Sequence, residues 1–398
     1  MEKIKVENLY KVFGPNPAEI IPMIKAGKTK DEIMEQTKHG VGVADASFTV
    51  NEGEILVIMG LSGSGKSTLV RCINRLIEPT AGSITVDGED VCALNTKALR
   101  QFRQKHFGMV FQNFALLPHR TVVRNVEYGL EIQKVDAQTR YQRAMEAIEQ
   151  VGLKGWEDSM PAQLSGGMQQ RVGLARALAL EAGIMLMDEA FSALDPLIRR
   201  NMQDELLSLQ EDVKKTILFI SHDLDEALKL GDRIVLMKDG AIIQQGTAEE
   251  ILTNPANDYV EKFVEEVDMS KVLTAETVMV DYGEMANTKT DGPKAALHKM
   301  RKLKTSSIFA RKDGKLDGIV FARDASAARE KGDKTLENII KRDIPTVTTD
   351  IVANELFPIM AEIDYPLAVV DEKRHLKGII VRGALLAALG DNLRDTGS

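Results

Sequence analysis

The stretch LSGGMQQR, residues 164–171, decides the fold of this chain. A serine and two glycines precede an expected helix, so bare backbone N–H groups at its N-terminus form a site for an anion. A complete phosphate-binding loop already lies at residues 60–67. The second anion site is therefore expected to act on a nucleotide that another copy of the chain holds.

Residues 60–67 read GLSGSGKS and fit the phosphate-loop pattern G-x-x-x-x-G-K-[ST]. They follow the apolar run 55–59, which predicts a buried strand, and precede residues 68–76, which predict a helix. In that setting Lys66 neutralises β- and γ-phosphate charge, and the Ser67 hydroxyl is a ligand for Mg²⁺. A chance glycine-rich turn is the alternative. The expected nucleotide contacts of the loop are Gly60, Ser62, Gly63, Ser64, Gly65, Lys66, Ser67 and Thr68.

Two further apolar runs end in polar side chains. Residues 184–187 lead into Asp188 and Glu189, and residues 216–220 lead towards His222. Asp188 suits the Mg²⁺ shell beside a phosphate loop. Glu189 is then placed to polarise the attacking water, and His222 to contact the γ-phosphate and that water. The alternatives are a glutamate that only caps the next turn and a structural histidine.

The order of these motifs resembles the ATP-binding subunit of an ABC transporter over residues 1 to 265. The motifs are the Walker A loop (60–67), Gln112 of the Q-loop, the signature (164–168), Walker B (184–189), Asp195 of the D-loop and the switch histidine His222. Met168 stands where many members of the family carry glutamine.

This resemblance implies an α/β fold: a P-loop NTPase core of the ABC ATPase type, RecA-like with a helical subdomain. It implies ATP and Mg²⁺ as ligands and two copies arranged head to tail. The implied catalytic residues are Glu189, His222 and Gln112, and the implied metal ligands are Ser67, Gln112 and Asp188. The residues implied to reach the nucleotide of the second copy are Ser165, Gly166, Gly167 and Asp195.

The N-terminal region carries an unusual insertion. Residues 11–14, KVFG, resemble the family motif whose aromatic ring stacks on adenine, which makes Phe13 a nucleotide contact; core packing of Phe13 is the alternative. An extra segment follows, from residue 15 to about residue 40. Within it residues 30–34 predict a short helix with Thr29 as its N-cap. The insertion resembles the ATPases of bacterial glycine betaine/proline betaine importers.

Composition favours two domains without a membrane span. A chain of 398 residues exceeds what one core usually holds, and no run approaches the roughly 20 apolar residues of a spanning helix. A net charge of −8 gives no reason to expect nucleic acid as a partner. The two cysteines fit a reducing compartment. Any membrane must then be crossed by partner subunits. The resemblance implies that residues 114–122 border the groove in which those subunits dock; the alternative is that these residues form the core of the helical subdomain.

The remaining part, residues 268–398, holds an internal repeat. A shift of 60 residues aligns Met300 with Met360 and Gly318 with Gly378 without a gap. Each copy, at approximately 274–328 and 336–390, predicts a helix, a strand, a turn and a strand. The pattern resembles a tandem CBS pair, an α+β module that commonly senses adenine nucleotides.

Two features of the tail suggest ligands. Asp324 matches the CBS aspartate that binds a ribose hydroxyl, but Phe321 replaces the usual threonine and Ala384 replaces the second aspartate. These departures count against a mononucleotide and leave a cyclic dinucleotide shared across a dimer open. A basic cluster also stands on or beside the first helix of the repeat; it is a solvated face, a site for an anionic membrane surface or a site for an anionic ligand. The cluster comprises Lys294, Lys299, Arg301, Lys302 and Lys304.

The resemblance therefore implies a peripheral subunit at the cytoplasmic face of a bacterial membrane. It implies hydrolysis of ATP to power import of glycine betaine or proline betaine through permease subunits that carry, or work with, a solute-binding domain or protein. An importer for another small solute is one alternative. A soluble ABC ATPase without a transport role is another, which the single cassette and the lack of coiled-coil heptads in residues 68–163 disfavour.

Overall fold

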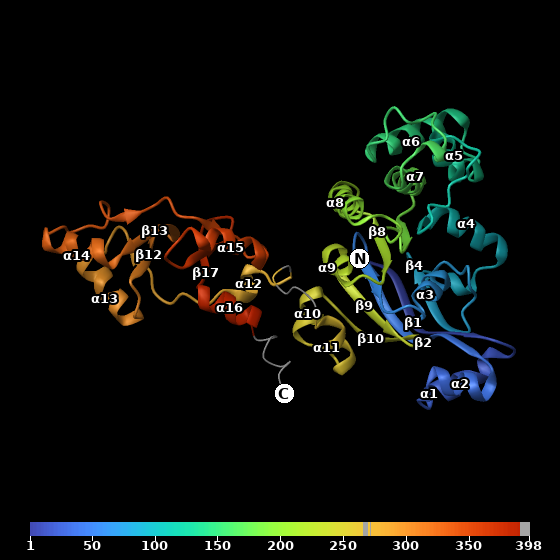
Figure 1. Cartoon of the computed structure of the whole chain (residues 1–398), viewed down its shortest axis with the longest axis horizontal. Helices are drawn as coiled ribbons and strands as arrows, with labels where there is room; N and C mark the ends of the chain where they lie inside the picture. The colour runs from blue at the N-terminus through green and yellow to red at the C-terminus, as the bar shows by residue number, and fades with distance from the viewer. Residues whose placement is uncertain (266–269, 271, 391–398) are drawn as a thin grey trace. The chain divides into compact units, whose positions relative to one another are not determined.

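The computed structural model describes residues 1–265, 270 and 272–390. The chain forms two compact units, residues 1–264 and residues 265–398 (Figure 1). The predicted domain boundary between residues 267 and 268 lies outside the described residues. Each unit has its own hydrophobic core.

A six-stranded sheet forms the centre of the first unit. Its strand order is β10-β9-β3-β8-β7-β6, and all neighbours are parallel except β10 and β9. All residues of β3 and β8 are buried, as expected for central parallel strands covered on both faces. The strands are β3 (Ile55–Met59), β6 (Phe107–Phe111), β7 (Ile184–Asp188), β8 (Thr216–Ser221), β9 (Arg233–Lys238) and β10 (Ala241–Gly246).

An antiparallel sheet, β2-β1-β4-β5, shares a core with this central sheet. Helix α3, Lys66–Ile73, contributes buried side chains to that core. It begins two residues before the predicted helix and ends three residues earlier, because Arg75 adopts a left-handed backbone conformation with φ 54°. The strands are β1 (Glu2–Phe13), β2 (Gly40–Asn51), β4 (Ala81–Val86) and β5 (Glu89–Asp90).

Three helices form the helical subdomain, which lies at the top of Figure 1. They are α5 (Val122–Ile132), α6 (Ala137–Gln150) and α7 (Gly166–Ala179), and all three pack against one another. Helix α7 also contacts β6, so the signature helix joins the subdomain to the central sheet. The other helices of this unit are α4 (Thr96–His106), α8 (Pro196–Val213), α9 (Leu224–Leu230), α10 (Ala248–Thr253) and α11 (Asp258–Val264).

The insertion folds into two short helices, α1 (Ile21–Lys25) and α2 (Lys30–Thr37). Thr29 is the N-cap of α2, as the sequence predicts, and forms a capping box with Glu32. A small apolar cluster of Val12, Ile20, Ile33 and Val41 attaches the helices to β1 and β2.

The second unit contains two small sheets, and each is built mainly from one copy of the repeat. The first sheet has the order β11-β12-β13-β14 and the second β15-β16-β17. The strands are β11 (Ala286–Asn287), β12 (Ser307–Lys312), β13 (Lys315–Phe321), β14 (Ile340–Lys341), β15 (Thr346–Val347), β16 (Leu367–Val370) and β17 (Leu376–Ile380). The helices are α12 (Ala275–Val278), α13 (Pro293–Leu303), α14 (Ala322–Glu330), α15 (Ala353–Ala361) and α16 (Arg382–Gly390).

The two copies are intertwined rather than consecutive. The N-terminal segment of the second copy pairs with the first copy, Lys341 opposite Ile319, and the N-terminal segment of the first copy pairs with the second, Val280 opposite Ile379. The aligned glycines permit both approaches. A Cβ on Gly318 would lie 2.4 Å from the Lys341 carbonyl oxygen, and a Cβ on Gly378 would lie 3.0 Å from that of Val280.

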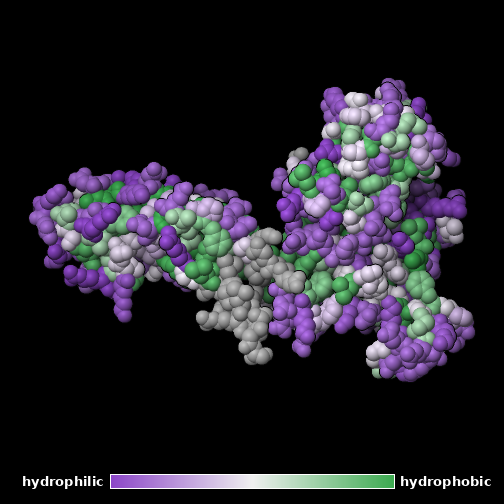
Figure 2. Space-filling model, in the orientation of Figure 1, coloured by the Kyte–Doolittle hydropathy of each residue, from purple (hydrophilic) through white to green (hydrophobic). Residues whose placement is uncertain are grey.

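Neither unit offers a membrane-crossing segment: across the described ranges, every helix is too short or too polar for that role. On the face shown in Figure 2, hydrophilic side chains predominate over both units, and hydrophobic ones are scattered or form small groups.

Candidate nucleotide site

The loop between β3 and α3 surrounds the Lys66 side chain. Lys66 is buried, and its ammonium donates to the carbonyl oxygens of Gly60 at 2.7 Å and Leu61 at 3.1 Å. Burial lowers the pKa of Lys66, and the nearby carboxylates of Glu189 and Asp188 act in the opposite direction. Gly65 starts α3 with φ 103°, and a Cβ there would lie 2.2 Å from the Gly42 carbonyl oxygen. Only glycine fits that position.

Strand β7 brings a carboxylate to the start of α3. The Ser67 hydroxyl donates to Asp188 Oδ1 at 3.0 Å, and the Arg71 guanidinium lies 3.3 Å from Asp188 Oδ2. A hydroxyl and a carboxylate at this distance are hard oxygen ligands of the kind that Mg²⁺ prefers beside phosphates. These two side chains therefore fit the metal that the sequence predicts. Within the described residues, no group of three or more His, Cys, Asp or Glu side chains forms a metal cage.

The acid and the histidine predicted for catalysis also meet. His222 Nδ1 lies 3.4 Å from Glu189 Oε2, and the Glu189 side chain is 24% exposed. Both residues follow the carboxyl ends of adjacent parallel strands, β8 and β7. Glu189 adopts φ 48°, which turns the chain sharply after Asp188.

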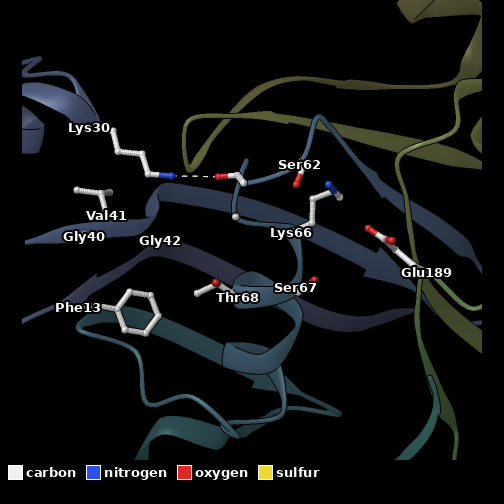
Figure 3. Close-up of a pocket in the computed structure, with 12 residues that line it drawn as sticks. Phe13, Lys30, Gly40, Val41, Gly42, Ser62, Lys66, Ser67, Thr68 and Glu189 are labelled. Carbon is white, nitrogen blue, oxygen red and sulfur yellow. Dashed lines mark hydrogen bonds between the residues drawn. The ribbon is translucent and has the colours of Figure 1, made fainter. Parts of the chain in front are cut away.

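A pocket of about 390 Å³ runs across the loop (Figure 3). Figure 3 shows Phe13 at one end and Glu189 at the other, with Lys66 and Ser67 between them. The Phe13 ring is 45% exposed, and the Lys11 ammonium lies 4.9 Å from its centroid. The residues that line the pocket are Phe13, Lys30, Gly40, Val41, Gly42, Ser62, Gly63, Gly65, Lys66, Ser67, Thr68 and Glu189.

Two residues of the loop that the sequence predicts as nucleotide contacts, Ser64 and Gly60, do not line the pocket. The Ser64 hydroxyl is buried without a hydrogen-bond partner in the described part of the chain, and Ser64 does not line the pocket. Its carbonyl oxygen instead accepts from the Gly240 N–H at 2.9 Å, which ties the loop to the turn before β10. The Gly60 carbonyl oxygen accepts a hydrogen bond from the Lys66 ammonium. Both residues shape the loop from inside.

The signature residues do not line the pocket of their own chain. Ser165 is the N-cap of α7, with its hydroxyl accepting from the Met168 N–H at 3.3 Å, and both Ser165 and Gly166 are exposed. Asp195 caps α8 in the same way. The two caps are neighbours, because the position of a Cβ on Gly167 lies 2.7 Å from Ile198 Cγ2.

The Q-loop is held by the signature helix, a contact that the sequence did not predict. Gln112 is exposed and follows Phe111, whose strand partner is Asp188. Beyond it Phe114 and Ala115 adopt left-handed backbone conformations, with φ 54° and 49°. Arg176 of α7 donates to both of their carbonyl oxygens, at 3.0 Å and 2.6 Å.

Three other side chains belong to the site or its support without a signal in the motifs. Lys30 reaches the pocket from the insertion, Arg71 lies beside Asp188, and Glu226 is buried against Ser221, the residue before the switch histidine. Glu226 accepts from the hydroxyl of Ser221 at 2.6 Å and from the amide of Gln203 at 3.1 Å. Only the fold brings these side chains to their partners.

The candidate tail site is less open than the motif suggests. The Phe321 ring packs edge-on against Tyr365 of the second copy, with centroids 5.6 Å apart. Asp324 lies in the first turn of α14, 3.5 Å from the Arg323 guanidinium. In the basic cluster, Lys299 and Lys302 are paired with Glu284, and Lys299 also with Asp291.

Comparison with known proteins identifies a family whose matched region contains most of these site residues. The family model described as ABC transporter matches residues 43–192, and the CBS domain model matches residues 336–391. The chain is 56% identical to "Glycine betaine transport ATP-binding protein OpuAA" of Bacillus subtilis over 98% of this chain and 93% of the relative. The chain belongs to the ATP-binding subunits of glycine betaine ABC transporters. As a member of that family it is an ATPase that powers solute import.

Other relatives match nearly the whole of this ATP-binding subunit or only part of it. ProV of Escherichia coli, named for glycine betaine/proline betaine transport, is 45% identical over 97% of both chains. TmoW of Ruegeria pomeroyi, named for trimethylamine N-oxide transport, is 54% identical over 68% of this chain and 80% of its own. A solved structure, the dimeric ATP-binding cassette MJ0796 bound to ADP and Pi, is similar with TM-score 0.52 and 31% identity. It covers 61% of this chain and 98% of that chain.

Proposed function

We propose that two copies of this chain bind ATP between them, head to tail. The observation that carries the proposal is the exposed position of Ser165 and Gly166, which lie at a helix N-terminus but outside the pocket of their own chain. A helix N-terminus with bare N–H groups suits a phosphate that arrives from a second copy. The similar cassette MJ0796 is dimeric with ADP and Pi bound, which supports the same arrangement.

Within each pocket the proposed roles follow from position. Phe13 stacks on the adenine, the loop N–H groups and Lys66 bind the phosphates, and Glu189 accepts a proton from the attacking water. His222 orients Glu189 and that water. Mg²⁺, when bound, offsets phosphate charge, and Ser67, Asp188 and Gln112 are its proposed ligands.

The transported solute is proposed to be glycine betaine or proline betaine. Full-length relatives named for these solutes support this assignment. The solute itself must be recognised by partner subunits, since TmoW shares more than half of its aligned residues with this chain yet is named for another solute. Integral permease subunits, with a solute-binding domain or protein, would place this chain at the cytoplasmic face of the membrane.

The proposed contact with the permease is the segment after Gln112. Leu116 and Leu117 are half-buried, and Pro118 and His119 are exposed at the surface of the helical subdomain. The contact of Arg176 with the preceding backbone would transmit movement of this segment to the signature helix.

The tail is proposed to regulate the cycle, through an adenine-containing ligand or through an anionic membrane surface. For a ligand, Asp324 is the candidate, although Phe321 closes the position of the usual threonine. For a membrane, the candidate residues are Lys294, Arg301 and Lys304, which are exposed and for which the described residues supply no acidic partner. Screening over roughly 8–10 Å would make such a contact sensitive to salt.

One pair of measurements tests the central proposal. The ATPase rate per chain should rise with chain concentration as dimers form; a constant rate over the whole range would contradict the shared site. Removing this chain from its host should abolish uptake of radiolabelled glycine betaine but not of trimethylamine N-oxide. The reverse pattern of uptake would contradict the assigned solute.

A further inference from the structure

The insertion places a lysine at the tip of the phosphate loop. Lys30, the first residue of α2, is half-buried, and its ammonium donates to the carbonyl oxygen of Gly63 at 3.0 Å. Lys30 lines the same pocket as Phe13 and Lys66, and Figure 3 shows it reaching over the loop from the side on which Phe13 lies. None of the phosphate-loop or signature motifs includes this residue.

The position of Lys30 is set by packing. The capping box of Thr29 and Glu32 fixes the first turn of α2, and the Glu32 carboxylate accepts from the Thr29 N–H at 2.7 Å. Ile33, one turn along, is 1% exposed in the cluster that attaches the insertion to β1 and β2. At the base of the insertion, the two ring nitrogens of His39 lie within hydrogen-bond distance of the Thr37 and Pro15 carbonyl oxygens. The ammonium is therefore presented by a folded element.

The charge of Lys30 has no carboxylate partner among the described residues. An ammonium has three donors, and within the described part of the chain the Lys30 ammonium has one acceptor, the Gly63 carbonyl oxygen. A cation is also unfavourable in the first turn of a helix, where the dipole favours anions. By contrast Lys28, two residues earlier, donates to the Gln36 side chain at 2.6 Å and does not line the pocket.

We propose that Lys30 is a nucleotide-binding residue that donates to the phosphate oxygens of bound ATP. This inference rests on the proposed nucleotide site. An unpaired cation beside a half-enclosed phosphate site gains a charge-assisted hydrogen bond when an anion arrives. The insertion then supplies a second lysine, in addition to Lys66, to the polyphosphate.

The test compares variants of the full chain by calorimetry with a non-hydrolysable ATP analogue, with ADP and with adenosine. Lys30→Gln keeps a neutral donor within reach of Gly63 but removes the charge. It should bind the ATP analogue roughly tenfold more weakly. It should bind adenosine as the wild type does, and the affinity for the analogue should depend less on salt. Lys30→Arg should restore most of the affinity, and Lys28→Gln is the matched control that should change nothing.

Two outcomes would overturn the inference. Unchanged affinity of Lys30→Gln for the analogue would show that Lys30 only positions the loop, as would an equal loss for adenosine. Lys66→Ala separates this failure from failure of the site itself. If Lys66→Ala also binds the analogue normally, the pocket is not the nucleotide site; if it loses binding while Lys30→Gln does not, only the role of Lys30 is wrong. Equal melting temperatures of the variants would show that the affinities compare folded proteins.

Discussion

Glu189 combines an unusual backbone conformation with a position between His222 and the nucleotide pocket. Its φ of 48° lies in the left-handed region, where residues other than glycine are uncommon, and such conformations are found at functional sites. The Ile220 carbonyl accepts from its backbone N–H at 3.1 Å, which ties the turn after β7 to β8. Its carboxylate is thereby held within reach of His222 and of the pocket.

Glu189→Gln should therefore retain nucleotide binding and lose turnover. The amide has nearly the same shape, so the phosphate loop and Lys66 remain in place, but it cannot accept the proton of the attacking water. ATPase activity should fall roughly a hundredfold or more, while the affinity for an ATP analogue stays close to that of the wild type. Glu211→Gln, on an exposed position of α8, is the matched control. Near-normal turnover of Glu189→Gln would exclude Glu189 as the general base.

Glu226 offers a separate prediction about stability and pH. Burial raises the pKa of its carboxyl group, while hydrogen bonds from Ser221 and Gln203 oppose the shift. The folded state thus holds the proton more tightly than the unfolded chain. This contribution to stability is present below the ordinary pKa of 4.5 and is lost as the pH rises through the raised pKa.

In Glu226→Gln the new side chain does not titrate and keeps both hydrogen bonds. Its carbonyl oxygen accepts from the Gln203 amide. Its own amide donates to the Ser221 oxygen, and the Ser221 hydroxyl donates to the Asp223 carbonyl oxygen, which already lies 3.2 Å away. The difference in melting temperature, variant minus wild type, should therefore become more positive from acidic to neutral pH. A difference that stays constant with pH would show that the carboxyl group has no raised pKa in the folded state.

At the scale of elements, helix α7 connects three parts of the site. Its N-terminus carries Ser165, its middle packs in the helical subdomain, and Arg176 near its end binds the backbone of Phe114 and Ala115. A movement of the Q-loop therefore acts directly on the helix that presents the signature.

Gly166→Asp should separate binding from hydrolysis. A Cβ on Gly166 would have no neighbour closer than 3.7 Å, and a carboxylate in the first turn of a helix is favourable, so the variant should fold normally. Its negative charge would repel the phosphate of a partner's nucleotide. ATP affinity of the separate chain should persist while turnover falls at least tenfold, and Ala162→Asp on the preceding exposed turn is the control.

Mixing Gly166→Asp with Lys66→Ala gives a further test of the shared site. In a mixed dimer one composite site carries both defects and the other carries neither, so mixing should restore part of the activity. If two inactive variants stay fully inactive in the mixture although mixed dimers form, one intact site is not sufficient for turnover. If Gly166→Asp alone has full turnover, the signature does not act on the nucleotide.

On the scale of the whole chain, the tail is a unit with its own core. Two apolar clusters lie within residues 273–385, and each includes side chains from the N-terminal segment of the other copy. Leu273 and Val278 pack with the second copy, and Leu336 packs with the first. Neither sheet is complete without the N-terminal segment of the other copy, so we expect the two copies to unfold together.

Removing residues 265–398 should leave an active ATPase. The motifs of the nucleotide site all lie in the first unit, which has its own core. The truncated chain should bind and hydrolyse ATP at close to the wild-type rate, and transport with its membrane subunits should no longer respond to salt or to adenine dinucleotides. An unchanged response to both would show that the tail only has a structural role, for example as a dimer clamp.

The basic cluster can be tested without disturbing the ion pairs of the tail. Lys294, Arg301 and Lys304 are exposed and have no acidic partner among the described residues, so changing them to glutamine should not unfold α13. If the cluster contacts anionic lipid, the triple variant should shift the salt threshold of transport in vesicles that contain anionic lipid. Lys312→Gln, where the side chain pairs with Glu337, is a control that should leave the threshold unchanged. An unchanged threshold in the triple variant would contradict the membrane role.

The sequence alone determined the strands, loops and caps of the nucleotide site, because each motif is local. A run of apolar residues followed by glycines or acids specifies a buried strand with a functional end, and β3, β7 and β8 form at those positions. It also determined the repeat of the tail. The contacts of Lys30 with Gly63 and of Arg176 with Phe114, and the exchange of segments between the copies, were decided only by the tertiary structure. These contacts join residues far apart in the chain, and the packing of whole elements brings them together.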